Sequence, residues 1–142
     1  MPEMVHRFEG SCHCEAIGFE LRSTLVAEAW SLRACQCSFC RGHGANMTSD
    51  PRGSVRFVIK DAAQLGRYRF GLHTADFFVC RRCGVYIAAV TTTGKGSFAT
   101  LNANVIRPAI ELRLAAPMSY DGESPAQRLT RREQRWTPVV DD

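Results

Sequence analysis

The seven cysteines are the residues of this sequence whose spacing most clearly predicts chemistry. They fall into three groups along the chain: Cys12 with Cys14, Cys35 with Cys37 and Cys40, and Cys80 with Cys83. An odd number of thiols cannot all pair as disulfides, whereas Cys-x-Cys and Cys-x-x-Cys spacings are typical of zinc ligands. We therefore expect two zinc sites, one with four cysteine ligands and one with three.

The first and last groups can complete one tetrahedral site. Cys80 and Cys83 stand in VCRRCGVY, where a tight turn can direct two sulfurs at one ion. Cys12 and Cys14 stand in GSCHCEAI and offer the second pair if the chain curls at His13, whose own side chain should point away from both. We predict a closed structural site that joins an early strand to a late hairpin; the alternative is two unrelated sets of buried free cysteines.

The middle group, CQCSFC, has no eighth cysteine to complete it. The fourth ligand at Cys35, Cys37 and Cys40 must therefore be a histidine, a carboxylate, water or a substrate, and an open position distinguishes catalytic from structural zinc. Three thiolates on Zn²⁺ leave a net charge of about −1, which makes a weak Lewis acid toward water. Such a centre can instead keep an exogenous thiol as a nucleophilic thiolate.

The RGHG segment that follows this group offers two further candidates. Arg41 could pair with a substrate carboxylate, and His43 could transfer a proton. The alternatives are that Arg41 is a solvated surface residue and that His43 closes the zinc site or stabilises the turn. We predict that Cys35, Cys37, Cys40, Arg41 and His43 form a catalytic site.

The elements that position these groups are mostly strands. Alternation of apolar and polar residues predicts strands at 15–22, 26–33, 54–60 and 67–70, and further strands fit 76–80, 85–91, 97–101 and 110–114. Asp61 and Gln64 could cap a single helical turn, and Ser124, Pro125 and Gln127 favour the start of a short helix over 126–136. The sequence therefore predicts a mainly β protein with a short C-terminal helix.

The composition predicts one soluble zinc-binding domain over residues 1–142, since 45% of the residues are hydrophobic. The longest apolar run is VYIAAV at 85–90, and the first ten residues have no apolar stretch like that of a signal peptide. We expect a cytoplasmic protein with no membrane contact.

The net charge gives little support to nucleic-acid binding. The formal charge of +4 would fall to about +1 with seven thiolates and two Zn²⁺ ions bound. Lys60 and Lys95 are the only lysines among 18 basic residues, and the arginines are dispersed from Arg7 to Arg135 rather than gathered in one tract.

Three segments together resemble the glutathione-dependent formaldehyde-activating enzyme family, which includes proteins similar to centromere protein V. They are GSCHCEAIGFEL, CQCSFCRGHGA and FFVCRRCGVYI, followed by YDGES at 120–124. The resemblance covers about 10–122 and leaves 123–142 as a C-terminal extension. It implies a β-tent zinc-binding fold of several small twisted antiparallel sheets. It also implies a structural zinc at Cys12, Cys14, Cys80 and Cys83 and a labile catalytic zinc at Cys35, Cys37 and Cys40.

The activity implied by the resemblance is that of a carbon-sulfur lyase similar to S-hydroxymethylglutathione synthase. The partners would be small molecules: a thiol, glutathione or a similar one, and formaldehyde or another small aldehyde. The alternative hypothesis is a non-catalytic zinc module that binds a protein partner. We set aside a third hypothesis, a zinc deaminase, because no Glu stands two residues after a single ligand and Val79 precedes Cys80 where that signature has proline.

Overall fold

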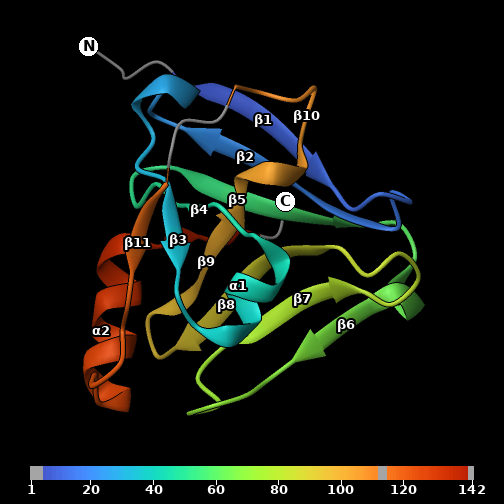
Figure 1. Ribbon diagram of the computed structural model, residues 1–142. Helices are drawn as coiled ribbons and strands as arrows, with labels where there is room; N and C mark the ends of the chain where they lie inside the picture. Colours follow the sequence, from blue (N-terminus) through green and yellow to red (C-terminus); the bar gives the residue numbers. More distant parts are fainter. Residues whose placement is uncertain (1–4, 112–114, 141–142) are drawn as a thin grey trace.

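The computed structural model describes residues 5–111 and 115–140, in which two β-sheets are accompanied by two α-helices (Figure 1). The strands are β1 (His6–Ser11), β2 (Ile17–Ser23), β3 (Arg33–Cys35), β4 (Met47–Thr48), β5 (Ser54–Ile59), β6 (Leu65–Tyr68), β7 (Asp76–Cys80), β8 (Tyr86–Thr93), β9 (Gly96–Asn102), β10 (Ile106–Arg107), β11 (Ala116–Met118) and β12 (Thr137–Pro138). The helices are α1 (Ser38–His43) and α2 (Pro125–Arg135), with 3₁₀ turns at Ala27–Ala29, Ala62–Gln64 and Ala103–Val105.

The first sheet is antiparallel and has the strand order β10-β1-β2-β5. Its β1–β2 hairpin is held close at one point, where Gly10 pairs with Phe19. A Cβ atom at Gly10 would lie 2.3 Å from Cζ of Phe19, so the aromatic ring can cover this strand only because the residue is glycine. The turn of this hairpin carries Cys12 and Cys14.

The second sheet has the order β11-β3-β4-β9-β8-β7-β6, and β12 pairs with β9 beside it. All of its pairs are antiparallel except that of β11 with β3. The β7–β8 turn carries Cys80 and Cys83, and Gly84 adopts a φ of 81° where the chain reverses. Strand β3 ends at Cys35, directly before α1.

The C-terminal segment connects the two sheets. In β12, Thr137 pairs with Ala99 of the second sheet. Just beyond, Val139 forms a parallel bridge with Val55 of the first sheet, and the Val140 N–H donates to the Val55 carbonyl at 2.8 Å. Helix α2, drawn in red in Figure 1, is therefore followed by a segment that pairs with the second sheet through β12 and with the first sheet through Val139.

The main hydrophobic core joins residues of both sheets. Ile17 and Leu21 come from β2, and Ile87 and Leu101 come from β8 and β9, all at most 1% exposed. Full burial of each such side chain contributes about 1.5–3 kcal/mol. A smaller core cluster contains Cys40, Met47, Tyr86 and Trp136.

The mainly β prediction is confirmed, and most predicted elements are present. Six predicted strands agree with β2, β5, β6, β7, β8 and β9 to within two residues at each end. The C-terminal helix has the expected capping box, in which Ser124 Oγ accepts from Gln127 N and Gln127 Oε1 accepts from Ser124 N. Asp61 caps a 3₁₀ turn through a 3.1 Å bond from Ala63 N.

One strand prediction was wrong. Residues 26–33 form a 3₁₀ turn at Ala27–Ala29 and only the start of β3. The apparent alternation arose because Trp30 is buried and packs edge-to-face on Phe8 at 4.6 Å, whereas Val26 is exposed. The strand predicted at 110–114 lies partly on residues 112–114, outside those described.

Candidate functional site

The first and last cysteine groups come together at one point between the two sheets. The Sγ atoms of Cys12 and Cys14 are 3.8 Å apart, and those of Cys14 and Cys80 are 3.6 Å apart. With Cys83, the four sulfurs all lie within 4.8 Å of one another. Tetrahedral zinc with bonds of about 2.3 Å separates its sulfurs by roughly 3.8 Å, so this group has the geometry that a zinc ion requires.

Local backbone bonds orient these sulfurs. The N–H groups of Ile17 and Cys83 donate to Sγ of Cys12 and Cys80 respectively, both at 3.4 Å. Burial raises the pKa of Cys12 to about 11, whereas at Cys83 the effect of burial is outweighed by the N–H groups of Cys14 and Val85 and the pKa falls to about 6. Metal binding would remove the protons from all four thiols, because a cysteine binds zinc as a thiolate.

The middle cysteine group is assembled by one short helix. Cys37 is the N-cap of α1, where its Sγ accepts from Cys40 N at 3.4 Å, and Cys35 ends the preceding strand. The three sulfurs lie within 4.8 Å of one another. Over the described residues, no His, Asp, Glu or further Cys joins them. This group can hold a metal ion and leaves a tetrahedral position free of protein ligands.

Proton sharing within this group is strongly uneven. A hydrogen bond with Cys40 lowers the pKa of Cys35 to about 5, and the same contact, together with burial, raises the pKa of Cys40. The deepest thiol thus keeps its proton when no metal is bound. A soft divalent cation would displace that proton and be held by all three thiolates.

A cavity of about 130 Å³ opens beside these three thiols. Its apolar wall includes Phe77, Tyr86 and Trp136, and Tyr86 is 2% exposed. Burial, followed by the charge on Cys40, holds the pKa of Tyr86 well above its usual value. The Tyr86 hydroxyl therefore remains a hydrogen-bond donor at neutral pH.

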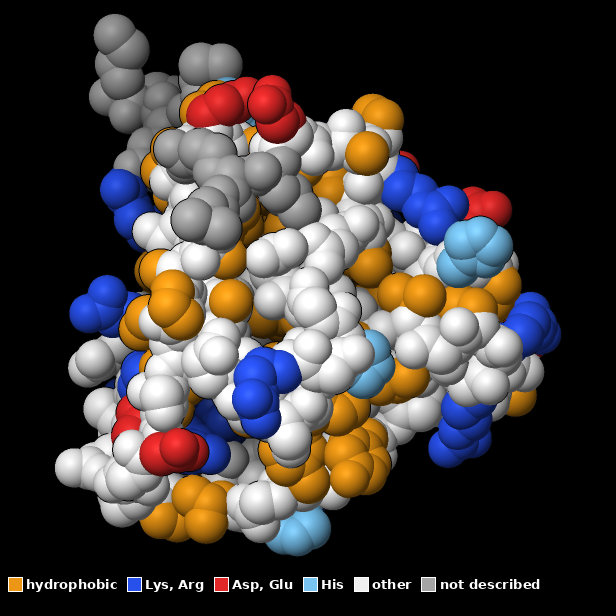
Figure 2. Space-filling view, in the orientation of Figure 1, with side chains coloured by type: hydrophobic (Ala, Val, Ile, Leu, Met, Phe, Trp, Pro, Cys, Tyr) orange, Lys and Arg blue, Asp and Glu red, His pale blue; other side chains and the backbone are white. Residues whose placement is uncertain are grey.

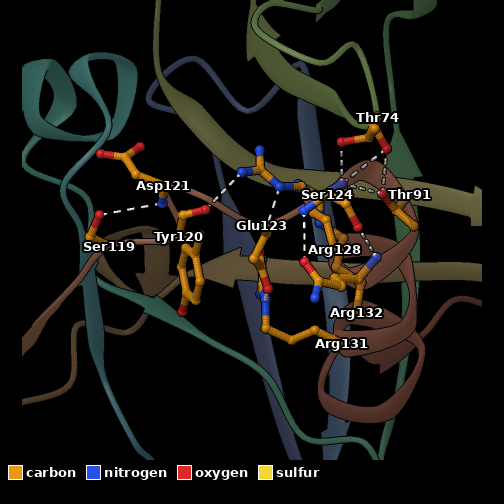
Figure 3. A network of polar contacts seen from close by, with 11 residues as sticks. Thr74, Thr91, Ser119, Tyr120, Asp121, Glu123, Ser124, Arg128, Arg131 and Arg132 are labelled. Atoms are coloured by element: carbon orange, nitrogen blue, oxygen red, sulfur yellow. Dashed lines mark hydrogen bonds and ion pairs between the residues drawn. The ribbon is translucent and has the colours of Figure 1, made fainter.

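Part of the cavity wall is cationic. Four arginines line it, from β3 and from α2: Arg33, Arg128, Arg131 and Arg132. Figure 3 shows that Arg128 and Arg131 lie next to Tyr120 and Glu123, whereas Arg132 contacts Thr74 and Thr91 at the other end of the network.

Glu123 is shared by two of these arginines. Its carboxylate accepts from Arg131 Nε at 2.9 Å and Nη2 at 3.1 Å, and lies 3.5 Å from Arg128 Nε. The Arg131 guanidinium also stacks on the Tyr120 ring at 3.7 Å. The bond from Arg131, opposed by burial, keeps the pKa of Glu123 below its usual value.

Arg132 is held by neutral groups. Its Nη1 donates to Thr74 O at 3.0 Å, Thr74 Oγ1 at 2.8 Å and Thr91 Oγ1 at 2.8 Å, and the guanidinium lies 4.7 Å from the Trp136 ring centroid. Burial, and then repulsion from Arg131 and Arg128, lowers the pKa of Arg132 to about 10.

Arg41 and His43 lie elsewhere. Both are exposed, and neither lines the cavity beside the thiols. His43 Nδ1 is 3.0 Å from the Phe39 carbonyl, its ring packs on Phe39 and Tyr86, and it borders a separate, shallower pocket together with His13. His43 is not part of the three-sulfur group, and His13 is not part of the four-sulfur group. The catalytic roles of Arg41 and His43 remain predictions that the cavity does not support.

Sequence reasoning missed the arginine wall and Tyr86. The dispersed arginines of the sequence are typical of surface residues, yet Arg132 in α2 is 6% exposed and lines the cavity. The available signal was the position of Arg132, four residues before Trp136 and therefore on the same helix face.

The molecular surface adds two observations. On the face drawn in Figure 2, the Lys and Arg side chains are scattered between hydrophobic areas and do not gather into one basic patch. Of the helices in the described ranges, none has the length and apolar character needed to cross a membrane.

Comparison with known proteins identifies the family of this chain. The sequence model of the glutathione-dependent formaldehyde-activating enzyme family matches residues 7–117. The fold is also similar to the crystal structure of a Rhodobacter sphaeroides protein, which was a structural genomics target. The two sequences are 29% identical and the TM-score is 0.61; the match covers 78% of this chain and 99% of the Rhodobacter chain. No curated protein matches. Because the family match covers most of the chain and includes all seven cysteines, the chain belongs to the glutathione-dependent formaldehyde-activating enzyme family.

Proposed function

We propose that the protein is a zinc-dependent enzyme of the carbon-sulfur lyase type, which adds glutathione or a similar thiol to formaldehyde or another small aldehyde. The observation that carries this proposal is the three-thiol group at Cys35, Cys37 and Cys40, which has no fourth ligand among the described residues and opens on a cavity. Family membership supports the same reaction.

The cysteine groups would have different tasks. Cys12, Cys14, Cys80 and Cys83 would hold a structural zinc, since their four sulfurs occupy every tetrahedral position. Cys35, Cys37 and Cys40 would hold a second, more labile zinc. When bound there, zinc supplies a Lewis acid that lowers the pKa of a thiol substrate.

The reaction is balanced without a redox partner. The substrate sulfur loses its proton, forms a bond with the aldehyde carbon, and the carbon-oxygen π electrons move to oxygen, which then takes up a proton. Tyr86 is the residue of this chain best placed to help, because it lines the cavity beside Cys40 and its buried hydroxyl stays protonated. A donor aimed at developing charge on oxygen stabilises the transition state. Phe77 and Trp136 would limit the access of water.

The cavity also helps to decide between an enzyme and the alternative hypothesis of a non-catalytic zinc module. A non-catalytic module that binds a protein partner predicts an exposed apolar patch and no pocket beside the three thiols. The presence of the cavity favours the enzyme. We further propose that residues 1–142 form one zinc-binding domain in the cytoplasm, and the pairing of β12 with β9 supports the inclusion of the C-terminal extension in that domain.

Metal analysis together with a reaction assay tests the proposed function. The purified protein should contain close to two zinc ions per chain, and NMR exchange spectroscopy should show faster formation of the hydroxymethyl thioether from formaldehyde and thiol than without protein. Cys37→Ser should lower the zinc content toward one and remove the acceleration. Absence of acceleration by the zinc-loaded wild type with glutathione and with short thiols would refute the reaction.

A further inference from the structure

The arginine wall beside the three thiols is unevenly neutralised. Glu123 bonds to Arg131 and lies near Arg128, whereas Arg33 and Arg132 have no carboxylate within 4.0 Å in the described part of the chain. Arg33 donates from Nη2 to Ser49 Oγ at 2.6 Å and more weakly to Thr100 Oγ1 at 3.3 Å, and both acceptors are neutral. Two cavity-lining guanidiniums are thus left without an anionic partner.

Both of these guanidiniums also keep unused donors. The Nε atoms of Arg33 and Arg132 are buried and have no hydrogen-bond partner among the residues described. A buried donor without a partner costs free energy, and a buried charge without a counterion costs more. An anionic oxygen group in the cavity would offset both costs, because guanidinium donors match carboxylate geometry.

The remaining charges near the cavity agree with this interpretation. Asp121 lines the cavity, but its side chain is exposed, so water can screen it. Burial, and then repulsion from Arg131 and Arg128, lowers the pKa of Arg132. An anion beside Arg132 would offset the repulsion from these two arginines.

The size of the cavity limits what carries that anion. About 130 Å³ is well below the ~300–1,000 Å³ that typically encloses a drug-sized ligand. The space fits a short molecule better than a whole tripeptide. Three of the four arginines come from α2, which lies beyond residues 7–117 matched by the family model. The matched part of the chain therefore supplies the thiols, and the extension supplies most of the cations.

We propose that the substrate is a short thiol that carries an anionic oxygen group, with Arg33 and Arg132 as the residues that select the anion. This inference rests on the proposed function for the binding of sulfur at Cys35, Cys37 and Cys40. The sulfur would lie at the three-cysteine site while the carboxylate or sulfonate bonds to the guanidiniums. The C-terminal extension would then supply Arg132, one of the two residues that select the anion.

Matched pairs of thiols test the inference by isothermal titration calorimetry on the zinc-loaded protein. 3-Mercaptopropionate should bind about 10- to 100-fold more tightly than 2-mercaptoethanol, which is one bond shorter and carries no charge. 2-Mercaptoethanesulfonate distinguishes a sulfonate from a carboxylate preference. Equal affinity for the charged and neutral thiols would overturn the inference, and so would a more than tenfold preference for glutathione over both acids.

Arginine variants test the assignment of residues. Arg33→Gln and Arg132→Gln should each reduce the preference for the acid about tenfold or more while leaving 2-mercaptoethanol binding unchanged. Because Arg132 is buried, Arg132→Lys tests whether restoring the charge restores the preference, with folding followed by circular dichroism. Arg135→Gln is the matched control, since Arg135 is exposed on the same helix and does not line the cavity. Equal weakening of both thiols in a folded Arg33→Gln protein would contradict the assignment.

The two proposals fail in different ways. If the wild type binds 3-mercaptopropionate selectively but does not accelerate its reaction with formaldehyde, the reaction is wrong and the ligand class stands. If the protein accelerates the reaction of neutral and acidic thiols equally, the reaction stands and the inference about the anion is wrong.

Discussion

The two cysteine groups use the same chemical group in opposite structural settings. The four-thiol group takes its members from two hairpins of different sheets, and its Cys12 and Cys80 are at most 1% exposed. The three-thiol group comes from six consecutive positions, 35–40, and lies beside a cavity. A metal at the first site would cross-link distant parts of the fold, whereas a metal at the second would organise one turn. We therefore expect loss of the first metal to affect folding and loss of the second to affect chemistry.

The largest effect should follow from breaking the four-thiol group. Cys80→Ser removes a ligand that is shared between the hairpins, and loss of a structural metal is among the changes that cost more than about 4 kcal/mol. We expect the zinc content to fall by one and the melting temperature by roughly 12 °C or more. Inductively coupled plasma mass spectrometry and thermal denaturation measure these changes.

Cys37→Ser in the other group is the matched control for this experiment. This variant should also lose one zinc but should lower the melting temperature much less than Cys80→Ser does, because the three thiols of this group come from one turn of the chain. If both variants unfold to the same extent, the distinction between a structural and a catalytic group does not hold.

The next largest effect concerns activity. Cys37→Ser should reduce kcat/KM by more than about 100-fold, since the group that lowers the pKa of the thiol is lost while the fold remains. Reaction rates by NMR and the near-ultraviolet circular dichroism spectrum report the two properties separately. A folded, zinc-depleted variant with wild-type rates would show that the three-thiol group is not the reaction centre.

A smaller loss of activity is expected from a substitution in the cavity wall. Tyr86→Phe removes only the buried hydroxyl, so kcat should fall about 100-fold with little change in KM, as for loss of one donor to a developing oxyanion. Tyr68→Phe is the control, because Tyr68 is 53% exposed and does not line the cavity. Equal rates for Tyr86→Phe and the wild type would remove this residue from the mechanism.

The smallest effect on stability is expected at Asp50, whose hydrogen bonds join two segments of the chain without a metal. Asp50 is 3% exposed and accepts from Thr24 N at 2.7 Å, Ser23 Oγ at 2.9 Å and Arg52 N at 2.9 Å. Burial alone would raise the pKa of Asp50, but these bonds outweigh it and the pKa is lowered. Asp50→Asn should therefore cost about 1–3 kcal/mol at pH 7.

The pH dependence of this cost follows from the direction of the shift. Because the folded state favours the charged carboxylate, its contribution is complete above the pKa of the unfolded chain, about 4, and is lost as the pH falls through the lowered value. Urea denaturation of both proteins should show a constant difference from pH 7 to 5 and a shrinking one below about pH 4. A difference that does not change with pH would contradict this assignment.

Much of the fold followed from the sequence because the signals were local. Strands such as β2 and β5 alternate over consecutive residues, and the helix start at Ser124 is encoded within four positions. The cysteine groups were also readable, since two-residue and three-residue spacings are local features of metal ligands. By contrast, the 3₁₀ turn at Ala27–Ala29 was missed because tertiary burial of Trp30 imitates a strand pattern.

The cavity could not be predicted in the same way. Arg33 and Arg132 are far apart in the chain and meet only because β11 pairs with β3 and α2 follows β11. Dispersed arginines are more often surface residues, so the sequence pointed instead to Arg41, the arginine next to the thiols. Proximity along the chain was a poor guide to proximity in the cavity.

The anchoring of α2 at both ends has a consequence for the speed and strength of ligand binding. Strand β11 pairs with β3, which carries Cys35, and β12 pairs with β9, so the helix between them cannot move far without breaking a sheet. Glu123 holds Arg131, and Thr74 and Thr91 hold Arg132, so part of the entropy of ordering these two side chains is lost during folding and not on association. A ligand meets a rigid, preformed receptor, and its affinity reports the contacts themselves.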